Sequence, residues 1–199
     1  MRTQPIAIGI PMDEVWFGKT VKRLFELDLM PWDMKLFVSS TYVPDARNKI
    51  HSAFLESGYD YLFMMDSDTG GPFDVIDRLL KHKKQVVCGW YPAKMEDHSK
   101  IYPVVYDYKG YKQKSEHYAH GQHHYKQREK PGTGLEKVDG VGAGCMMMHR
   151  TVAEKLGKRP YDMNTGGEDL VLCTKLRELG IPIYVDWNLR CKHAGVGEW

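Results

Sequence analysis

Two carboxylates, spaced two residues apart, follow an apolar run in the first half of the chain. The segment Tyr61–Met65 is apolar and of strand length, and Asp66, Ser67 and Asp68 come directly after it. Two carboxylates held close together repel each other unless a proton or a cation lies between them. Mg²⁺ and Mn²⁺ prefer oxygen ligands and commonly pair one or two carboxylates with substrate phosphates. The pair therefore indicates a site for a divalent cation and a phosphate-bearing ligand.

Further acidic and imidazole side chains occur in the last third of the chain. Glu168 and Asp169 follow Gly166 and Gly167 and open a helical pattern. Acidic residues in the first turn of a helix are favoured by the helix dipole, so they have a structural explanation. A carboxylate held in a cleft is also suited to act as a general base. His193 becomes a metal-ligand candidate only if other ligands lie beside it.

The first ninety residues alternate between strand and helix patterns, and these elements must position the carboxylates. The predicted order is strand, helix, strand, helix, strand, helix, strand, over residues 6–10, 20–29, 34–39, 44–57, 61–65, 73–82 and 85–90. This alternation predicts an α/β fold with a mostly parallel central sheet and helices on both faces. Ligands of such sheets bind beyond the carboxyl ends of the strands, where Asp66 and Asp68 are expected.

The chain changes character after this alternation. Residues 95–136 are polar and lack periodicity, which predicts a loop excursion over the sheet. Beyond it, residues 138–149 predict a glycine-punctuated strand, 168–179 a helix and 181–185 the last strand. The loop contains four histidines, a composition that can bind metal: His117, His120, His123 and His124. Because no carboxylate or cysteine stands at ligand spacing, a polar surface loop is favoured.

Composition restricts the class of protein. The chain has 199 residues, 42% of them hydrophobic and 12% aromatic, which suits one well-packed domain and argues against disorder. A formal net charge of +2 with scattered Lys and Arg gives no reason to expect nucleic acid as a partner. The four cysteines form no CxxC pair, which fits a reduced protein. No run approaches the ~18 apolar residues of a transmembrane segment, and no signal peptide is evident, so we expect a cytoplasmic protein.

The ordered set of motifs resembles the GT-A glycosyltransferases, most closely those of the family-2 type. The resemblance covers nearly the whole chain. It is carried by the opening strand that ends at Pro11, Ala46-Arg47-Asn48, the strand that leads to Asp66-Ser67-Asp68, Gly142-Ala143-Gly144-Cys145, Gly167-Glu168-Asp169 and the terminal His193.

The resemblance implies a metal-dependent enzyme that moves a sugar from a nucleotide-diphosphate sugar, such as a UDP- or GDP-sugar, to an acceptor hydroxyl. Asp66, Asp68 and His193 would hold Mn²⁺ or Mg²⁺ on the donor diphosphate. The implied donor-binding residues are Pro11, Arg47, Asn48, Asp66, Ser67 and Asp68.

The resemblance also implies roles on the acceptor side. Asp169 would deprotonate the acceptor hydroxyl, Glu168 would orient the acceptor or the base, and a family-2 enzyme would invert the anomeric centre. Trp90 and Tyr91 have flat faces suited to sugar stacking, although an aromatic residue at the end of a strand more often serves packing.

The resemblance divides the expected single domain, residues 1–199, into three parts. These are a nucleotide-binding half (1–92), the polar loop (93–137), which could carry acceptor specificity, and an acceptor and catalytic half (138–199). One feature departs from the family: the usual second acidic residue on the nucleotide-binding strand is missing. Ser39 and Ser40 stand near its place, and Asp45 could substitute for it.

Four alternatives share parts of this pattern. A retaining GT-A enzyme would have the same fold and metal site. A phosphatase of the haloacid-dehalogenase type needs Thr two places after the second Asp, whereas Thr69 and Gly70 follow in the reverse order. A sugar nucleotidyltransferase would need a glycine-rich basic loop near the N-terminus, which the sequence does not supply. A non-catalytic carbohydrate-binding relative would have no need of Asp169.

Overall fold

A computed structural model of the chain describes residues 2–12, 27–94, 101–112, 122–163 and 167–194. Its seven-stranded central sheet has the order β2-β1-β3-β10-β5-β11-β8. The strands are β1 (Ala7–Met12), β2 (Met34–Ser39), β3 (Tyr61–Met65), β5 (Val86–Trp90), β8 (Leu135–Val138), β10 (Cys145–His149) and β11 (Ile183–Arg190). The helices are α2 (Val43–Glu56), α3 (Val75–Lys81), α4 (Arg150–Leu156) and α5 (Glu168–Glu178).

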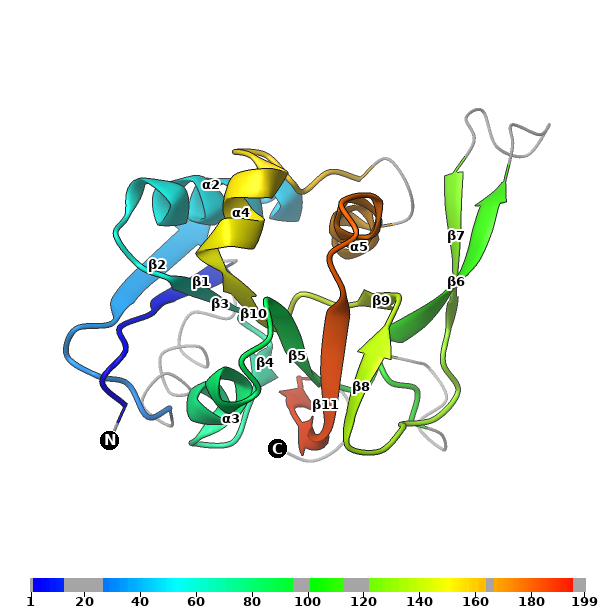
Figure 1. The fold of residues 1–199 in the computed structure, drawn as a ribbon, viewed down its shortest axis with the longest axis horizontal. Coiled ribbons are helices and arrows are strands. Elements are labelled where there is room, and N and C mark those ends of the chain that lie inside the picture. Colours follow the sequence, from blue (N-terminus) through cyan, green and yellow to red (C-terminus); the bar gives the residue numbers. More distant parts are fainter. Residues whose placement is uncertain (1, 13–26, 95–100, 113–121, 164–166, 195–199) are drawn as a thin grey trace.

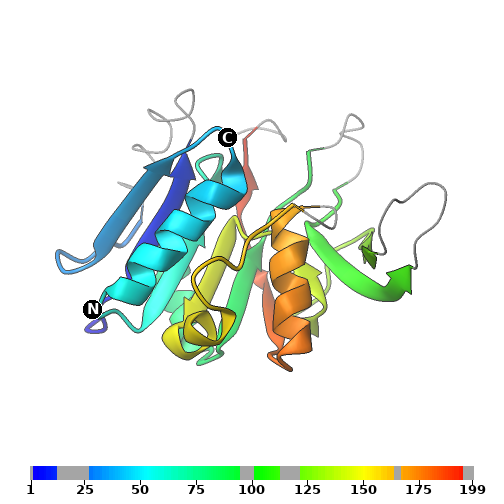
Figure 2. The same cartoon turned by 90° about the horizontal axis from the view of Figure 1, so that it is seen from above.

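The central sheet is mostly parallel. β1 pairs in parallel with β2 and with β3, and β11 pairs in parallel with β5. β10 lies antiparallel between β3 and β5, so those two strands run in the same direction, and β8 is antiparallel to β11. Figure 1 shows α2, α4 and α5 on one face of the sheet and α3 on the other, and Figure 2 shows the first three side by side across it. The predicted α/β fold with a mostly parallel sheet is confirmed.

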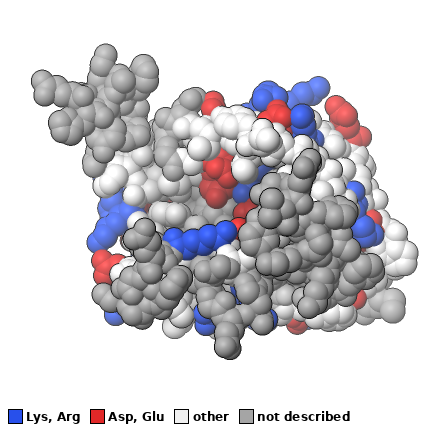
Figure 3. All heavy atoms as spheres, turned by 180° about the vertical axis from the view of Figure 1, so that it is seen from behind, with Lys and Arg blue, Asp and Glu red and all other residues white. Residues whose placement is uncertain are grey.

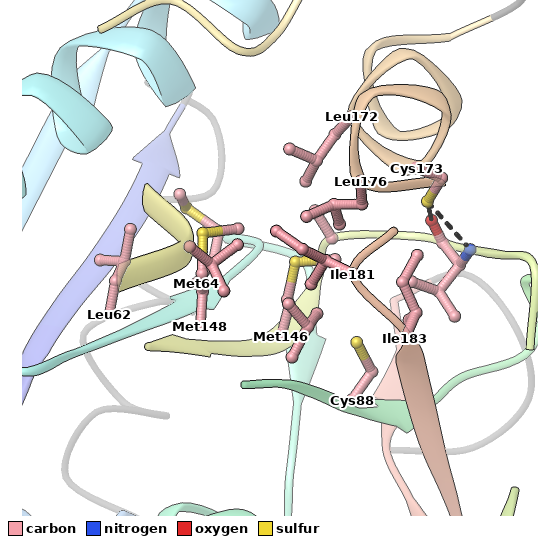
Figure 4. Close-up of a cluster of buried hydrophobic side chains, with 14 of the residues drawn as sticks. Leu62, Met64, Cys88, Met146, Met148, Leu172, Cys173, Leu176, Ile181 and Ile183 are labelled. Atoms are coloured by element: carbon pink, nitrogen blue, oxygen red, sulfur yellow. Dashed lines mark hydrogen bonds between the residues drawn. The ribbon is translucent and has the colours of Figure 1, made fainter. Parts of the chain in front are cut away.

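Each face of the sheet has its own apolar core, because neighbouring residues of the central strands point to opposite faces. On one face, Met64 of β3 and Met146 of β10 pack with Leu172 and Leu176 of α5, and Figure 4 shows these side chains meeting. On the other face, Phe63 packs with the apolar side of α3. Burying both faces of β3 fixes the position at which the chain emerges at Asp66.

Residues 95–136 correct the expectation of a loop. β6 (Val105–Lys112) and β7 (Gln122–Gln127) form an antiparallel hairpin, and β8 joins the edge of the central sheet. Tyr108, Tyr111, His123 and Tyr125 alternate with polar residues on paired strands, a pattern that was obscured by the many charged neighbours. His117 and His120 lie outside the described residues, as does most of the predicted helix at 20–29.

The predicted strand 138–149 is also divided. Val138 is the last residue of β8, β9 (Gly140–Val141) pairs with β6, a turn follows, and β10 returns to the central sheet. The last strand is longer than expected, since β11 continues to Arg190. Within the described part of the chain, no helix has both the length and the apolar character needed to cross a membrane.

Candidate functional site

A cleft of about 400 Å³ lies beyond the carboxyl ends of the parallel strands. Figure 3 views the molecule from behind and shows acidic atoms recessed in a hollow, with basic atoms beside them. Among the residues proposed from the sequence, the cleft is lined by Pro11, Arg47, Asp66, Ser67, Asp68, Glu168, Asp169 and His193. The fold therefore brings together residues that are more than 180 positions apart in the chain.

A small two-stranded ribbon brings His193 to Asp68. β4 (Thr69–Gly70) pairs antiparallel with β12 (Lys192–His193), so His193 stands opposite Thr69. The backbone N–H of Ala194 donates to the carbonyl oxygen of Asp68 at 2.7 Å, which extends this pairing. As a result, His193 Nε2 lies 3.3 Å from Asp68 Oδ2.

The ring of His193 is oriented by a backbone carbonyl. His193 Nδ1 lies 2.8 Å from the carbonyl oxygen of Pro92, a partner that accepts but cannot donate. Nδ1 must therefore carry the proton, and the lone pair of neutral His193 is on Nε2, toward Asp68. Histidine ligands of metals are commonly fixed in this way, with the non-coordinating N–H bonded to a carbonyl or carboxylate.

Asp68 is stabilised as a carboxylate. Burial alone would raise its pKa, but the hydrogen bonds that the protonated form of His193 and Lys94 donate to it hold the pKa below its ordinary value. Lys94 Nζ contacts Asp68 Oδ2 at 2.5 Å. Lys94 was not singled out in the sequence. Its position soon after β5, whose carboxyl end points toward the same edge as that of β3, is the signal that could have found it.

Arg47 connects three of the carboxylates in the cleft. Its Nη2 lies 2.8 Å from Asp66 Oδ1 and 3.6 Å from Asp169 Oδ1, and its Nε donates to Glu168 Oε1 at 3.2 Å. The Arg47 side chain is only 2% exposed. Burial would lower the pKa of Arg47, but Asp66, Asp169 and Glu168 raise it well above its ordinary value. The guanidinium is therefore permanently charged and surrounded by carboxylates.

Asp169 has the properties expected of a general base. Burial raises its pKa to about 7, with Glu168 and Asp66 adding to the effect and Arg47 opposing it. Its buried Oδ1 has no hydrogen-bond partner among the described residues. A carboxylate with a pKa near neutrality and an unused oxygen is able to accept a proton from a hydroxyl. Gly167 precedes this helical turn with φ at 136°, a conformation that residues with side chains rarely adopt.

The turn between β9 and β10 packs behind Asp66 and Tyr91, two residues that line the cleft. The Gly144 N–H donates to the Tyr91 hydroxyl at 3.1 Å, and the Asp66 N–H donates to the Gly144 carbonyl at 3.2 Å. A Cβ at Gly144 would lie 2.7 Å from Asp66 Oδ2 and 2.9 Å from the Tyr91 hydroxyl. The small-residue segment therefore allows the backbone to pack directly behind Asp66.

Of the other residues considered in the sequence, some line the cleft and others lie elsewhere. The Asn48 amide is occupied by the backbone of Tyr161, since Nδ2 donates to its carbonyl at 2.9 Å and Oδ1 accepts from its N–H at 3.0 Å. Asn48 does not line the cleft. Its two hydrogen bonds instead hold α2 against the segment before α5. Trp90 is buried against Trp187, whereas Tyr91 lines the cleft. Ser40 also lines the cleft, and Asp45 is paired with Lys49 at 2.7 Å.

The cleft has an excess of negative charge. Four carboxylates line it against two cationic side chains, Arg47 and Lys94, which leaves a formal charge of −2 when His193 is neutral. Over the described ranges, no three His, Cys, Asp or Glu side chains converge closely enough to hold a metal ion by themselves. Asp68 and His193 offer two ligands, which fits a cation that also takes oxygen ligands from a bound diphosphate.

Comparisons with known proteins show the fold. No protein-family model matches the chain, and no curated protein matches it in sequence. A197 from STIV superimposes with a TM-score of 0.63 at 19% identity, over 96% of this chain and 85% of that one. GalNAc-T7, solved with UDP, GalNAc and Mn²⁺, superimposes with a TM-score of 0.64 at 10% identity, over 96% of this chain and 44% of that one. The chain therefore has a GT-A-type α/β fold and spans less than half of GalNAc-T7.

Proposed function

We propose that this protein transfers a sugar from a nucleotide-diphosphate sugar to an acceptor hydroxyl with the help of a divalent cation. The observation that carries the proposal is the 3.3 Å approach of His193 Nε2 to Asp68 Oδ2 in a cleft that also contains Asp169. The structural likeness to GalNAc-T7, which binds UDP and Mn²⁺, supports a uridine diphosphate donor as the first candidate.

Asp68 and His193 are the residues that would hold Mn²⁺ or Mg²⁺. When bound, such a cation offsets the negative charge that develops on the departing diphosphate. Asp66, two residues before Asp68, has its Oδ1 engaged by Arg47, so its Oδ2 is the oxygen that would be available to the donor or to the cation. Ser67 and Pro11, which line the same cleft, would contact the donor as well.

Asp169 would act as the general base in an inverting displacement, as in the family-2 enzymes. The acceptor O–H bond breaks as Asp169 takes the proton, and the oxygen forms a bond to the anomeric carbon. The bond from that carbon to the diphosphate breaks, and the diphosphate leaves with the electron pair. Glu168 supports the proposed arrangement because it shares Arg47 with the base.

The β6–β7 hairpin is the proposed acceptor surface. Val104, directly before β6, lines the cleft, and the pKa of Tyr106 is raised by burial and by the charge of Asp169. Tyr106 is therefore within electrostatic reach of the base, and Tyr108 and Tyr111 lie further along the same strand. Aromatic rings with hydroxyl groups offer both stacking and hydrogen bonds to a saccharide. We accordingly assign donor binding mainly to residues 1–92 and acceptor binding to residues 93–199.

The test is thermal-shift screening of UDP-, GDP-, dTDP- and CMP-sugars, each with Mn²⁺ and with EDTA. We expect one nucleotide class to raise the unfolding midpoint only with the metal, and Asp68→Asn or His193→Gln to abolish that shift. Asp60→Asn is the matched control and should keep the metal-dependent shift, because Asp60 is an exposed carboxylate directly before β3, at the end of the strand opposite to Asp66. If no nucleotide gives a metal-dependent shift, the proposed function is wrong. For the active donor, proton NMR of the product gives the anomeric configuration.

A further inference from the structure

The Arg47 guanidinium contacts carboxylates from two parts of the chain, one on the donor side and one on the acceptor side of the proposed reaction. Asp66 follows β3 beside the proposed metal ligands, whereas Glu168 and Asp169 open α5 on the proposed acceptor side. Arg47 reaches all three, with its Nη2 shared between Asp66 Oδ1 at 2.8 Å and Asp169 Oδ1 at 3.6 Å. In the described part of the chain, Arg47 is the one cationic side chain that forms an ion pair with Asp169.

We propose that Arg47 is a positioning residue that holds the base Asp169 in register with Asp66, and that it is not a ligand of the nucleotide. This inference rests on the proposed function. It differs from the role that the family resemblance implies for Arg47, which is donor binding.

The contacts of Arg47 support positioning over nucleotide binding. Two of its three nitrogens are already committed to carboxylates, through Nε to Glu168 and Nη2 to Asp66. A phosphate or a base edge that bound through Nε or Nη2 would displace one of these partners and leave a partly buried carboxylate without its counter-charge, so Nη1 is the one nitrogen of Arg47 that remains for such a ligand. The planar fork of arginine also fixes the direction of its hydrogen bonds, which suits it to setting the geometry between two partners.

Positioning matters because the reacting atoms must be aligned. A misplacement of ~1 Å at a catalytic group can cost on the order of 100-fold in rate. Without Arg47, three carboxylates would repel one another, and Asp169 would turn away from Asp66. The donor, held by Asp68, His193 and the nucleotide pocket, would still bind. Loss of Arg47 should therefore lower turnover while donor affinity is kept.

The experiment compares Arg47→Met and Arg47→Lys with wild type. Lys49→Met is the matched control, because Lys49 lies on the same helix, is 58% exposed and pairs with Asp45 outside the cleft. Arg47→Met leaves three neighbouring carboxylates without their shared cation, and their repulsion could prevent folding. Arg47→Met/Glu168→Gln is therefore included, because it removes one of the three negative charges and should fold more readily. Calorimetric titration with UDP in Mn²⁺ measures donor affinity, and initial rates with the active UDP-sugar give kcat and KM.

We expect Arg47→Met to lower kcat about 100-fold, while the affinity for UDP and the donor KM stay within about threefold of wild type. Arg47→Lys should recover part of the rate, since an ammonium can satisfy one or two of the carboxylates. Lys49→Met should behave as wild type. A loss of UDP affinity that matches the loss of rate would overturn the proposal, and Arg47 Nη1, which is buried and has no hydrogen-bond partner among the described residues, would then be the nucleotide ligand.

A second readout separates this inference from the proposed function. If wild type does not bind UDP, unfolding midpoints in EDTA still report whether Arg47 couples to Asp169. Positioning predicts that Arg47→Met lowers the midpoint and that adding Asp169→Asn recovers part of the loss, because the added change removes a stranded carboxylate. If the two midpoint shifts simply add, Arg47 does not hold Asp169 and the inference is wrong, whatever the activity.

Discussion

At the scale of single residues, the main feature of the site is an excess of carboxylates in a partly buried cleft. Asp66, Glu168 and Asp169 share one guanidinium, and burial, followed by the charge of the neighbouring carboxylates, raises the pKa of both aspartates. Such an arrangement costs stability and persists where it has a use. Two uses match these groups: Asp66 lies beside the proposed site for a divalent cation and a diphosphate, and Asp169 is placed to accept a proton.

Asp169→Asn tests the use of Asp169 as a base. The amide keeps the size of the side chain but cannot take the acceptor proton, so we expect transfer to fall by about 10² to 10⁴. Binding of UDP in Mn²⁺ should be unchanged, because Asp169 has no part in the proposed metal shell. Parallel rate and calorimetric measurements check this. Transfer that persists at a tenth of the wild-type rate would assign the base elsewhere.

The pKa of Asp169 also predicts how stability depends on pH. The pKa is about 7 in the folded protein and 3.8 for an ordinary Asp, so between these values the folded state retains a proton that the unfolded state has lost. Stability from this group is therefore fully present below about pH 4 and declines as pH rises to about 7. We expect the midpoint of Asp169→Asn, relative to wild type, to rise by a few degrees from pH 5 to pH 8 in EDTA. An unchanged difference would mean that the carboxyl is solvated.

At the scale of elements, the turn from β9 to β10 determines where Asp66 sits. In Gly144→Ala, the new Cβ would come within 2.7 Å of Asp66 Oδ2 and 3.0 Å of Thr69 Cγ2. We expect a loss of about 1–3 kcal/mol in the free energy of unfolding, as for other overpacking changes, and weaker metal-dependent binding of UDP. Gly58→Ala is the control, because apart from its immediate chain neighbours no atom lies within 4 Å of the position its Cβ would take. Equal behaviour of the two variants in chemical denaturation would contradict this account.

The β6–β7 hairpin gives a second prediction at this scale. Tyr111 is 57% exposed and packs edge-on against His123, with ring centroids 5.2 Å apart, so Tyr111→Ala should fold normally. If the hairpin holds the acceptor, transfer to di- and trisaccharides should fall about tenfold, the order expected for one lost aromatic contact of 1–1.5 kcal/mol. Hydrolysis of the donor by water should be unchanged. A parallel fall in both rates would argue against an acceptor role.

The same elements show what the sequence could and could not predict. The strand that delivers Asp66 was predictable, because an apolar run of strand length ends abruptly at a carboxylate. The hairpin was not, because its alternation is broken by a shift in register between Tyr108 and Tyr111 and diluted by Lys and Gln. Asn48 was misplaced for a different reason. The motif predicts the helix that contains Asn48. Which side of that helix faces the cleft depends on packing against Tyr161, which is distant in the sequence.

At the scale of the whole molecule, the site depends on contacts between the first and last parts of the chain. β10 and β11 complete the sheet begun by β1 to β3, and β12 carries His193 back to β4. Hydrogen bonds from one arginine of α4 also fix the position of α2 relative to α4. Arg150, the first residue of α4, donates to carbonyl groups at the carboxyl-terminal end of α2, where the helix itself offers too few N–H partners.

Arg150 is expected to be a major contributor to stability away from the cleft. Its Nε donates to the Tyr59 carbonyl at 2.7 Å, its Nη1 to Leu55 at 3.2 Å and its Nη2 to Phe54 at 3.0 Å. An ammonium cannot span these acceptors, so Arg150→Lys should lose about 2–4 kcal/mol, given roughly 1.5–3 kcal/mol for a hydrogen bond to a charged group. For a chain of this size, that lowers the unfolding midpoint by roughly 5–15 °C.

The control for Arg150→Lys is Arg159→Lys, since Arg159 is 68% exposed and its pair with Asp45 is 3.7 Å long. That change should move the midpoint by less than about 1 °C, because exposed ion pairs contribute little. Below its midpoint, Arg150→Lys should still bind UDP in Mn²⁺ with wild-type affinity, because Arg150 lies at the opposite end of α2 from the cleft. Scanning calorimetry with and without ligand measures both. An equal midpoint for the two variants would show that α2 and α4 are held by their apolar contacts alone.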